Sequence, residues 1–183
     1  MTTLIREARC PDAAGIARVH VASWQSTYRR IVPDAYLDGL SVEERQRMWE
    51  RGLCGAEGTT AVFVAMHEDT GEIVGFAAGG PEQSGTDPVY PWELYAIYLL
   101  ADRQQRGIGK RLAAALVERL WQRGARSLLL WVLAENLPAR RFYEALGGAV
   151  VYERPIGIGG VDLPELAYGW RDLAALQTRA GLE

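Results

Sequence analysis

Apolar residues recur along this chain with two periods, one typical of amphipathic helices and the other of half-buried strands. In the N-terminal half, these periods predict a strand at residues 4–8, helices at 11–28, 34–40 and 42–51, and strands at 60–66 and 72–80. The capping box Ser41–Glu44 supports the third helix. Turn residues 67–71 join the last two strands into a predicted hairpin.

In the C-terminal half, a long apolar strand begins at Glu93 and leads into an amphipathic helix that starts after Gly107. A second apolar run, residues 127–133, precedes a short helix predicted at 137–146. Two further strands are expected at 149–154 and 165–170, connected by a loop too long for a tight turn. No repeat or linker interrupts the order, so residues 1–183 are predicted to form a single α/β or α+β domain.

The turn between the long strand and its helix has the features of a phosphate-binding loop. The first N–H groups of a helix lack intrahelical partners, and Gly107 and Gly109 remove the Cβ atoms that would hold an anion away from them. Two stricter motifs fail, because Leu112 replaces the third Rossmann glycine and Arg111 replaces the Ser or Thr of a P-loop. Alone, the glycine pair is also compatible with an ordinary turn before a helix.

A second polar motif follows the next strand. Asn136 is a good N-cap residue, and Pro138 suits a first helical turn. Tyr143 lies seven residues after Asn136, so the amide and the phenol are expected on one face of the short helix.

Together these segments resemble the signature of the GNAT superfamily of acyl-CoA-dependent N-acetyltransferases. That signature is Gln/Arg-x-x-Gly-x-Gly/Ala, matched by Gln104–Gly109, followed by Asn-x-x-Ala-x-x-x-Tyr, matched by Asn136, Ala139 and Tyr143. The resemblance covers residues 61–151 and implies a mixed, mostly antiparallel sheet flanked by helices. It also implies acetyl-CoA as cosubstrate, with no metal.

The resemblance also assigns a cofactor site, because the family holds the CoA pyrophosphate on the loop amides and pairs the pantetheine arm with the preceding strand. The residues implied are Ile97, Tyr98, Leu99, Gln104, Gln105, Arg106, Gly107, Ile108, Gly109, Lys110, Asn136, Ala139 and Tyr143. A main-chain N–H at Leu99 or its neighbour would polarise the thioester if the strand is bulged there. The basic residues Arg103, Arg106, Lys110 and Arg111 are candidates for the 3′-phosphate or form a solvated helix start.

Two side chains are candidates for catalysis. The resemblance implies that Tyr143 protonates the departing thiolate, whereas packing in the core is the alternative. Glu93, fourteen residues before Gly107, matches the offset of the base glutamate in the histone acetyltransferase branch. Burial would have to raise its pKa, or water would have to relay the proton; the alternative is a solvent-facing strand end. A different branch places its base five residues before the asparagine, where this chain has Trp131.

The acceptor site is implied near the first helices. Trp24, Tyr28, Tyr36 and Trp92 are the substrate-binding candidates, with loop 157–163 able to close the pocket. Trp24 and Tyr28 lie four residues apart on a helix, a spacing that is more often found for core residues than for pocket residues. The six tryptophans indicate either an aromatic cleft or a homodimer interface.

Composition limits the function classes. With 49% hydrophobic residues the chain is expected to fold, and a net charge of −3 gives no support for nucleic-acid binding. No apolar run approaches the ~20 residues that cross a membrane, and no signal peptide is recognised, so a cytoplasmic location is expected. Cys10 and Cys54 form no CxxC pair and have no neighbouring His, so neither a disulfide framework nor a zinc site is expected.

The favoured function is acetylation of a primary amine on a small molecule or amino-acid-like compound. A peptide or protein acceptor, and an acyl-CoA-binding module without turnover, are the alternatives. The acceptor, the acyl-chain preference and the oligomeric state are not specified by the sequence.

Overall fold

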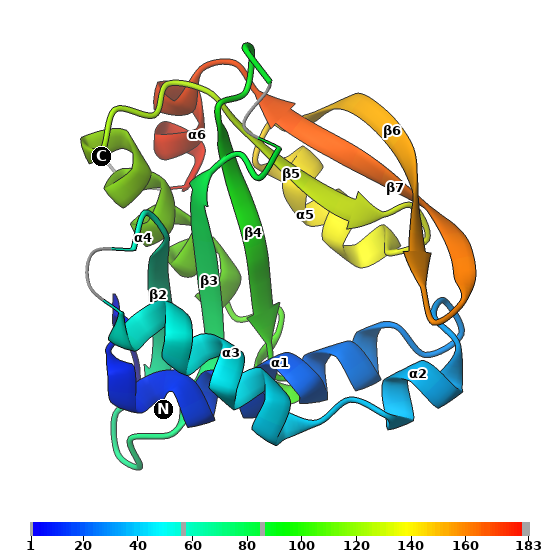
Figure 1. Ribbon diagram of the computed structural model, residues 1–183. Helices are drawn as coiled ribbons and strands as arrows, with labels where there is room; N and C mark the ends of the chain where they lie inside the picture. The colour runs from blue at the N-terminus through cyan, green and yellow to red at the C-terminus, as the bar shows by residue number, and fades with distance from the viewer. Residues whose placement is uncertain (1, 56–57, 85–86, 181–183) are drawn as a thin grey trace.

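The computed structural model describes residues 2–55, 58–84 and 87–180 (Figure 1). Its elements are β1 Thr3–Glu7, α1 Ala13–Thr27, α2 Asp34–Asp38, α3 Val42–Cys54, β2 Ala61–His67, β3 Ile73–Pro81, β4 Trp92–Leu99, α4 Ile108–Gln122, β5 Leu128–Leu133, α5 Leu137–Ala145, β6 Ala149–Ile158, β7 Val161–Trp170 and α6 Leu173–Ala180. Single 3-10 turns, η1 Cys10–Asp12 and η2 Ala101–Arg103, precede α1 and α4. The predicted elements from β1 to α5 are confirmed, with ends shifted by a few residues.

The described strands form one seven-stranded sheet in the order β1-β2-β3-β4-β5-β7-β6. In this described part of the chain, β4 and β5 pair in parallel and the other neighbours pair antiparallel. The parallel pair follows from the crossover through α4, since parallel neighbours require a long connection. The mixed, mostly antiparallel sheet confirms the predicted fold class.

Helices cover both faces of the sheet. The apolar stripe of α4, with Leu112, Leu116 and Leu120 fully buried, packs on one face. On the opposite face, α1 and α3 pack through Ile16 and Trp49 against Phe76 of β3. Because β3 is covered on both sides, its residues from Ile73 to Gly80 are all buried. The sheet therefore holds β4, the strand of the first motif, in the centre of the molecule.

The connection between the last two strands differs from the prediction. Residues 155–162 were expected to form a long loop, but β6 and β7 continue to Ile158 and Val161 and are joined by Gly159 and Gly160. Both glycines have positive φ, 61° and 83°, which a two-residue type I′ hairpin turn requires. A Cβ at Gly159 would lie 2.9 Å from Cβ of Tyr36, so the hairpin tip approaches α2 closely.

Helix α6 is an addition that sequence periodicity did not predict. Asp172 caps it, since its Oδ1 accepts a hydrogen bond from the N–H of Ala174 (2.9 Å). Leu173 and Leu176 are buried in the core on the α4 side of the sheet. With only eight residues, the helix is too short to establish a period in the sequence.

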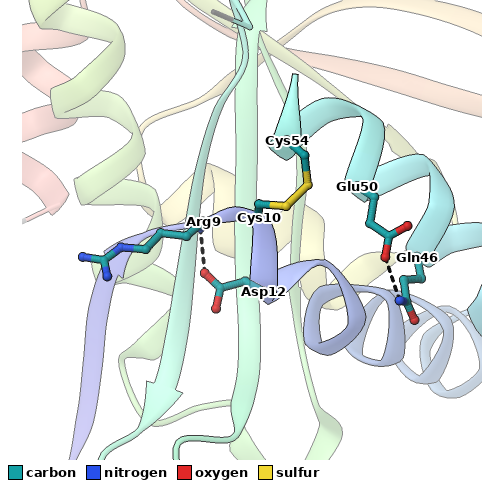
Figure 2. Close-up of a disulfide and its surroundings, with 6 residues drawn as sticks. All are labelled: Arg9, Cys10, Asp12, Gln46, Glu50 and Cys54. Carbon is teal, nitrogen blue, oxygen red and sulfur yellow. Dashed lines mark hydrogen bonds between the residues drawn. A yellow bond between two sulfur atoms is a disulfide. The ribbon is translucent and has the colours of Figure 1, made fainter. Parts of the chain in front are cut away.

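The two cysteines contradict the expectation that the chain has no disulfide. Cys10 and Cys54 are bonded, with their Cα atoms 4.8 Å apart (Figure 2). Helix α3 packs along α1, tied to it by a hydrogen bond from Trp49 Nε1 to His20 Nδ1 (3.3 Å), and its end returns to η1. This packing joins cysteines 44 residues apart, a closure that in the chain-entropy model stabilises the fold by about 4 kcal/mol. The spacing alone gave no signal of it.

Helix length and hydropathy bear on the membrane prediction. Among the described residues, no helix is both long and apolar enough to cross a bilayer.

Candidate active site

Strands β4 and β5 diverge from one another (Figure 1). Residues of both strands line a cleft. Within the described residues the two strands pair at a single position, Glu93 with Leu129. A β-bulge lies in β4, because Ala96 pairs with Ala78 and Leu94 pairs with Gly79, which leaves Tyr95 as the extra residue. The cleft has a volume of about 960 Å³ and is lined by β4, β5, α5, the end of α1 and the turn before α4.

The bulge and the hydrogen-bond pattern decide which main-chain groups face this cleft. Leu100 N–H donates to the carbonyl of Val74 (3.0 Å), so the antiparallel ladder directs Leu99 and Ile97 away from β3 and towards the cleft. The same alternation turns the main chain of Tyr98 towards β3, whereas Tyr98 itself is among the residues that line the cleft. The bulge itself lies four residues before Leu99, not at it.

The carbonyl of Leu99 already has two donors. Ser23 Oγ donates to it from α1 (3.1 Å), and Gln104 Nε2 donates to it from the turn (3.2 Å). Gln104 therefore ties the turn before α4 to the end of β4 as well as lining the cleft. The free main-chain group of Leu99 on the cleft side is its N–H.

The turn before α4 has the backbone conformation that a phosphate cradle needs. Gln105 and Gly107 have positive φ, 59° and 76°, and Gly107 directly precedes α4. A Cβ built on Gly107 would meet no atom within 4 Å, so the space in front of it is open. Gln105, Gly107, Gly109 and Lys110 all line the cleft. Ile108 is buried beneath the turn and Arg106 is exposed outside the cleft wall, so neither expected side chain lines it.

Positive charge reaches the cleft from Lys110, which the sequence motif includes, and from two arginines that it does not include. Lys110 lines it together with Arg141 of α5 and Arg179 of α6. Two members of the predicted basic cluster are engaged elsewhere, since Arg103 pairs with Asp102 (3.1 Å) and Arg111 donates to the Thr3 carbonyl (2.9 Å). The sequence could have indicated Arg141 as a cleft residue, because it lies five residues after Asn136 on the same helix as Tyr143. No sequence pattern indicated Arg179.

Asn136 and Ala139 lie where the motif predicts. The Asn136 side chain accepts a hydrogen bond from the N–H of Ala139 (3.3 Å) and so caps α5. Asn136 lines the cleft together with Tyr28 from the end of α1. Burial raises the pKa of the Tyr28 phenol, and the nearby Asn136 amide partly opposes this rise.

Tyr143 lines the cleft and is otherwise buried. Its ring packs against Phe142, Tyr168 and Trp170, with ring centroids 5.5, 6.0 and 6.4 Å away. Burial, and then the proximity of Tyr28, raise the pKa of the Tyr143 phenol well above its usual value. The hydroxyl is therefore protonated over the physiological range and can serve as a hydrogen-bond donor.

Glu93 lies at the closed end of the splayed strands and is not among the residues that line the cleft. Its side chain is 7% exposed, and Oε2 accepts a hydrogen bond from the N–H of Gln83 (3.1 Å). Burial raises the pKa of the carboxyl, outweighing the hydrogen bond from Gln83. The solvent-facing alternative is therefore wrong.

Of the four aromatic candidates for acceptor binding, all within the described residues, Tyr28 lines the cleft. Its hydroxyl lies 3.5 Å from that of Tyr98. Trp24 packs between Tyr28 and Tyr36, with centroids 4.9 and 6.2 Å away, behind the cleft wall. Trp92 packs against the core on the α4 side. Trp24, Tyr36 and Trp92 are thus not among the residues that line the cleft.

His20 stacks on Tyr98 of β4, and Trp131 belongs to β5. Burial lowers the pKa of His20 to about 4, and its Nδ1 accepts the hydrogen bond from Trp49. Trp131, at the position where one branch of the family carries its base, lines the cleft instead. Within the described residues, no group of three or more His, Cys, Asp or Glu side chains is arranged to hold a metal ion.

Comparison with known proteins agrees with this geometry. A model of the acetyltransferase (GNAT) family matches residues 17–148. The chain is 43% identical over 175 residues to the uncharacterized N-acetyltransferase YuaI of Bacillus subtilis (strain 168), covering 95% of this chain and 96% of that protein.

Two solved structures share the fold. The PaiA N-acetyltransferase from Thermoplasma acidophilum in complex with coenzyme A superimposes with a TM-score of 0.70 at 20% identity, covering 90% of this chain and 98% of that one. YncA from Salmonella typhimurium, solved with its cofactor acetyl-CoA, gives a TM-score of 0.69 at 20% identity and covers 94% and 95%.

Proposed function

Because this chain belongs to the GNAT family of acetyltransferases, we propose that it transfers an acetyl group from acetyl-CoA to a primary amine of a small or amino-acid-like molecule. One observation carries the proposal: a single cleft runs from the left-handed turn at Gly107, between the splayed strands, to the buried phenol of Tyr143. Such a cleft can hold an extended thioester with its anionic end at a helix N-terminus and its sulfur beside a proton donor. The whole chain acts as one N-acetyltransferase domain in this proposal.

The residues of the cleft fit acetyl-CoA in order along its length. The N-terminal amides of α4 would bind the pyrophosphate, with Lys110, Arg141 and Arg179 balancing the phosphate charges. The N–H groups of Ile97 and Leu99 face the cleft and would pair with the pantetheine arm and polarise the thioester carbonyl. Ile97 lies two residues after the bulge at Tyr95, and Leu99 lies four residues after it.

The chemical step then needs a base for the ammonium group and an acid for the thiolate. The neutral amine attacks the carbonyl carbon, a C–N bond forms, and the C–S bond breaks. Tyr143 donates its phenolic proton to the sulfur, because its raised pKa keeps that proton in place until a thiolate is formed. Glu93 accepts the proton of the ammonium group through water. Burial raises the pKa of Glu93, so it lies closer to the pKa of an ammonium group than the pKa of an exposed glutamate does.

Replacement of Glu93 by glutamine is expected to lower kcat/KM at neutral pH by roughly 10²-fold, the lower end for a positioned base. Gln keeps the shape of the side chain and removes its basicity. In the wild type, log kcat/KM should rise with pH until the pKa of Glu93 or of the amine is passed. In the variant the rate should recover partly at high pH, where free amine is abundant.

The pH profiles of both proteins test this role. His20 is the competing base, but a pKa near 4 makes it a weaker proton acceptor than an exposed histidine. His20→Asn is therefore the matched variant, expected to keep the pH profile of the wild type. Equal rates for Glu93→Gln and wild type at every pH would remove Glu93 from the mechanism.

The function itself is tested by thiol release from acetyl-CoA with a panel of small amines, amino acids and short peptides. Turnover with small amines supports the proposal, and turnover confined to peptides would favour a peptide or protein acceptor. Acetyl-CoA binding measured by calorimetry, without turnover on any amine, would instead indicate a binding module.

A further inference from the structure

Within this proposed function, and resting on it, we propose that Arg154 binds a carboxylate of the acceptor. The substrate class would then be amino acids and related amines that carry a carboxylate a few bonds from the reacting nitrogen. Arg154 comes from β6, outside the two sequence motifs, and it plays no part in cofactor binding or proton transfer as described above.

Neighbouring strands hold the guanidinium of Arg154 in a fixed place. Its Cζ lies 3.8 Å from the ring centroid of Trp131 on β5, so the planar group rests on the indole face. Its Nε donates to Oε1 of Glu165 on β7 (2.6 Å), the residue directly opposite Arg154 in the β6–β7 register. Trp131 lines the cleft, and Arg154 stacks on this lining residue without being one itself.

This arrangement leaves the outer edge of the guanidinium available. The Arg154 side chain is 52% exposed, whereas that of Glu165 is 6% exposed. Within the described part of the chain, the hydrogen bond of Arg154 uses Nε, and its two terminal nitrogens have no protein acceptor. Two terminal N–H groups in one plane match the two oxygens of a carboxylate. Stacking and the Nε bond also reduce the side-chain entropy that a ligand would otherwise have to restrict.

The position of Glu93 adds a second charge of opposite sign. Glu93 is paired with Leu129, and Trp131 lies two residues further along β5. The side chains of Glu93 and Trp131 therefore project from the same face of the sheet, the face on which Arg154 stacks on Trp131. The charge of Arg154 is felt at Glu93, where it opposes the rise of the carboxyl pKa caused by burial. A zwitterion would therefore place its ammonium group towards Glu93 and its carboxylate on Arg154.

Arg154 also has a structural explanation, since it neutralises the buried charge of Glu165. The two roles give different kinetic results. A structural role would change stability, or the rate with every acceptor alike. A recognition role changes the preference between acceptors that differ only in the carboxylate.

The test compares each L-amino acid accepted by the wild type with its primary carboxamide, as a ratio of the two kcat/KM values. The wild type should favour the free acid, and Arg154→Gln should lower that ratio by about 10- to 100-fold, the value of hydrogen bonds to a charged group. Arg154→Lys keeps the charge without the planar fork and should give an intermediate ratio. Calorimetry should show the same acetyl-CoA affinity in all three proteins.

Arg126→Gln is the matched control, because Arg126 also stacks on a tryptophan, Trp121 (4.1 Å), and neither residue lines the cleft. Its acid-to-carboxamide ratio should equal that of the wild type. Amine turnover with no preference for the free acid, or a ratio that Arg154→Gln and Arg154→Lys leave unchanged, would overturn this inference alone. Acetyl-CoA binding with no amine acetylated would overturn the proposed function and this inference with it.

Discussion

Replacement of Tyr143 by phenylalanine is expected to lower kcat by roughly 10²–10⁴ while acetyl-CoA affinity stays nearly unchanged. The ring is held by Phe142, Tyr168 and Trp170, and phenylalanine preserves those contacts. Only the hydroxyl is lost, and with it the proton that the proposed mechanism gives to the departing thiolate. Steady-state kinetics with an accepted amine, together with calorimetry for acetyl-CoA, measures both quantities.

Two other tyrosines give controls for this experiment. Tyr28 lines the same cleft, and its phenol pKa is also raised by burial, so Tyr28→Phe tests the competing acid. Tyr168→Phe removes a buried hydroxyl that donates to Glu144 (2.6 Å) outside the cleft lining, and it reports the cost of losing a structural hydrogen bond. If Tyr143→Phe kept the wild-type kcat, or if the fall in kcat occurred in Tyr28→Phe instead, the Tyr143 side chain would serve only in packing.

Local sequence signals predicted the parts of the site that local structure determines. A glycine pair between a strand and a helix predicts a turn with positive φ, and the structure has one at Gly107. Asn136 and Tyr143 occupy one helix, so their spacing placed both at the same cleft. The strands and helices from β1 to α5 could likewise be predicted from the sequence, because each has its own period of apolar residues.

The remaining features depend on contacts between distant segments. The separation of β4 from β5 and the bulge at Tyr95 depend on how β3, β4 and β5 pair with one another. Neither feature changes the hydrophobic periodicity of any one of these strands. The Cys10–Cys54 bond depends on α3 packing against α1. Arg179 reaches the cleft because α6 docks on the core beside α4, although 36 residues separate Arg179 from Tyr143 in the sequence.

The aromatic residues show the same limit within a single helix. Trp24 and Tyr28 are four residues apart and share a helix face, yet only Tyr28 reaches the cleft lining in the described structure. Trp24 is held behind it by Tyr36 and the aromatic ring of Tyr28. Periodicity assigns residues to a face, and it does not say how deep in that face each side chain lies.

Gly107→Asp is expected to raise the Kd for acetyl-CoA by roughly a thousandfold. The new Cβ has no neighbour within 4 Å in the free protein, so the substitution fills the space that the proposal gives to the pyrophosphate. A carboxylate about 4 Å from a phosphate charge costs about 4 kcal/mol at an effective dielectric constant near 20. The carboxylate also occupies the positive end of α4 that the ligand needs. Calorimetry with acetyl-CoA measures the loss.

Two variants separate the charge from the backbone conformation. Gly107→Asn has nearly the same shape without the charge and tolerates positive φ, so its Kd should rise only by about tenfold. Gly124→Asp places the same residue at φ 99°, also with no neighbour within 4 Å, beyond the opposite end of α4. It should show a similar loss of thermal stability and wild-type affinity for acetyl-CoA. Wild-type affinity in a folded Gly107→Asp protein would mean that the pyrophosphate binds elsewhere in the cleft.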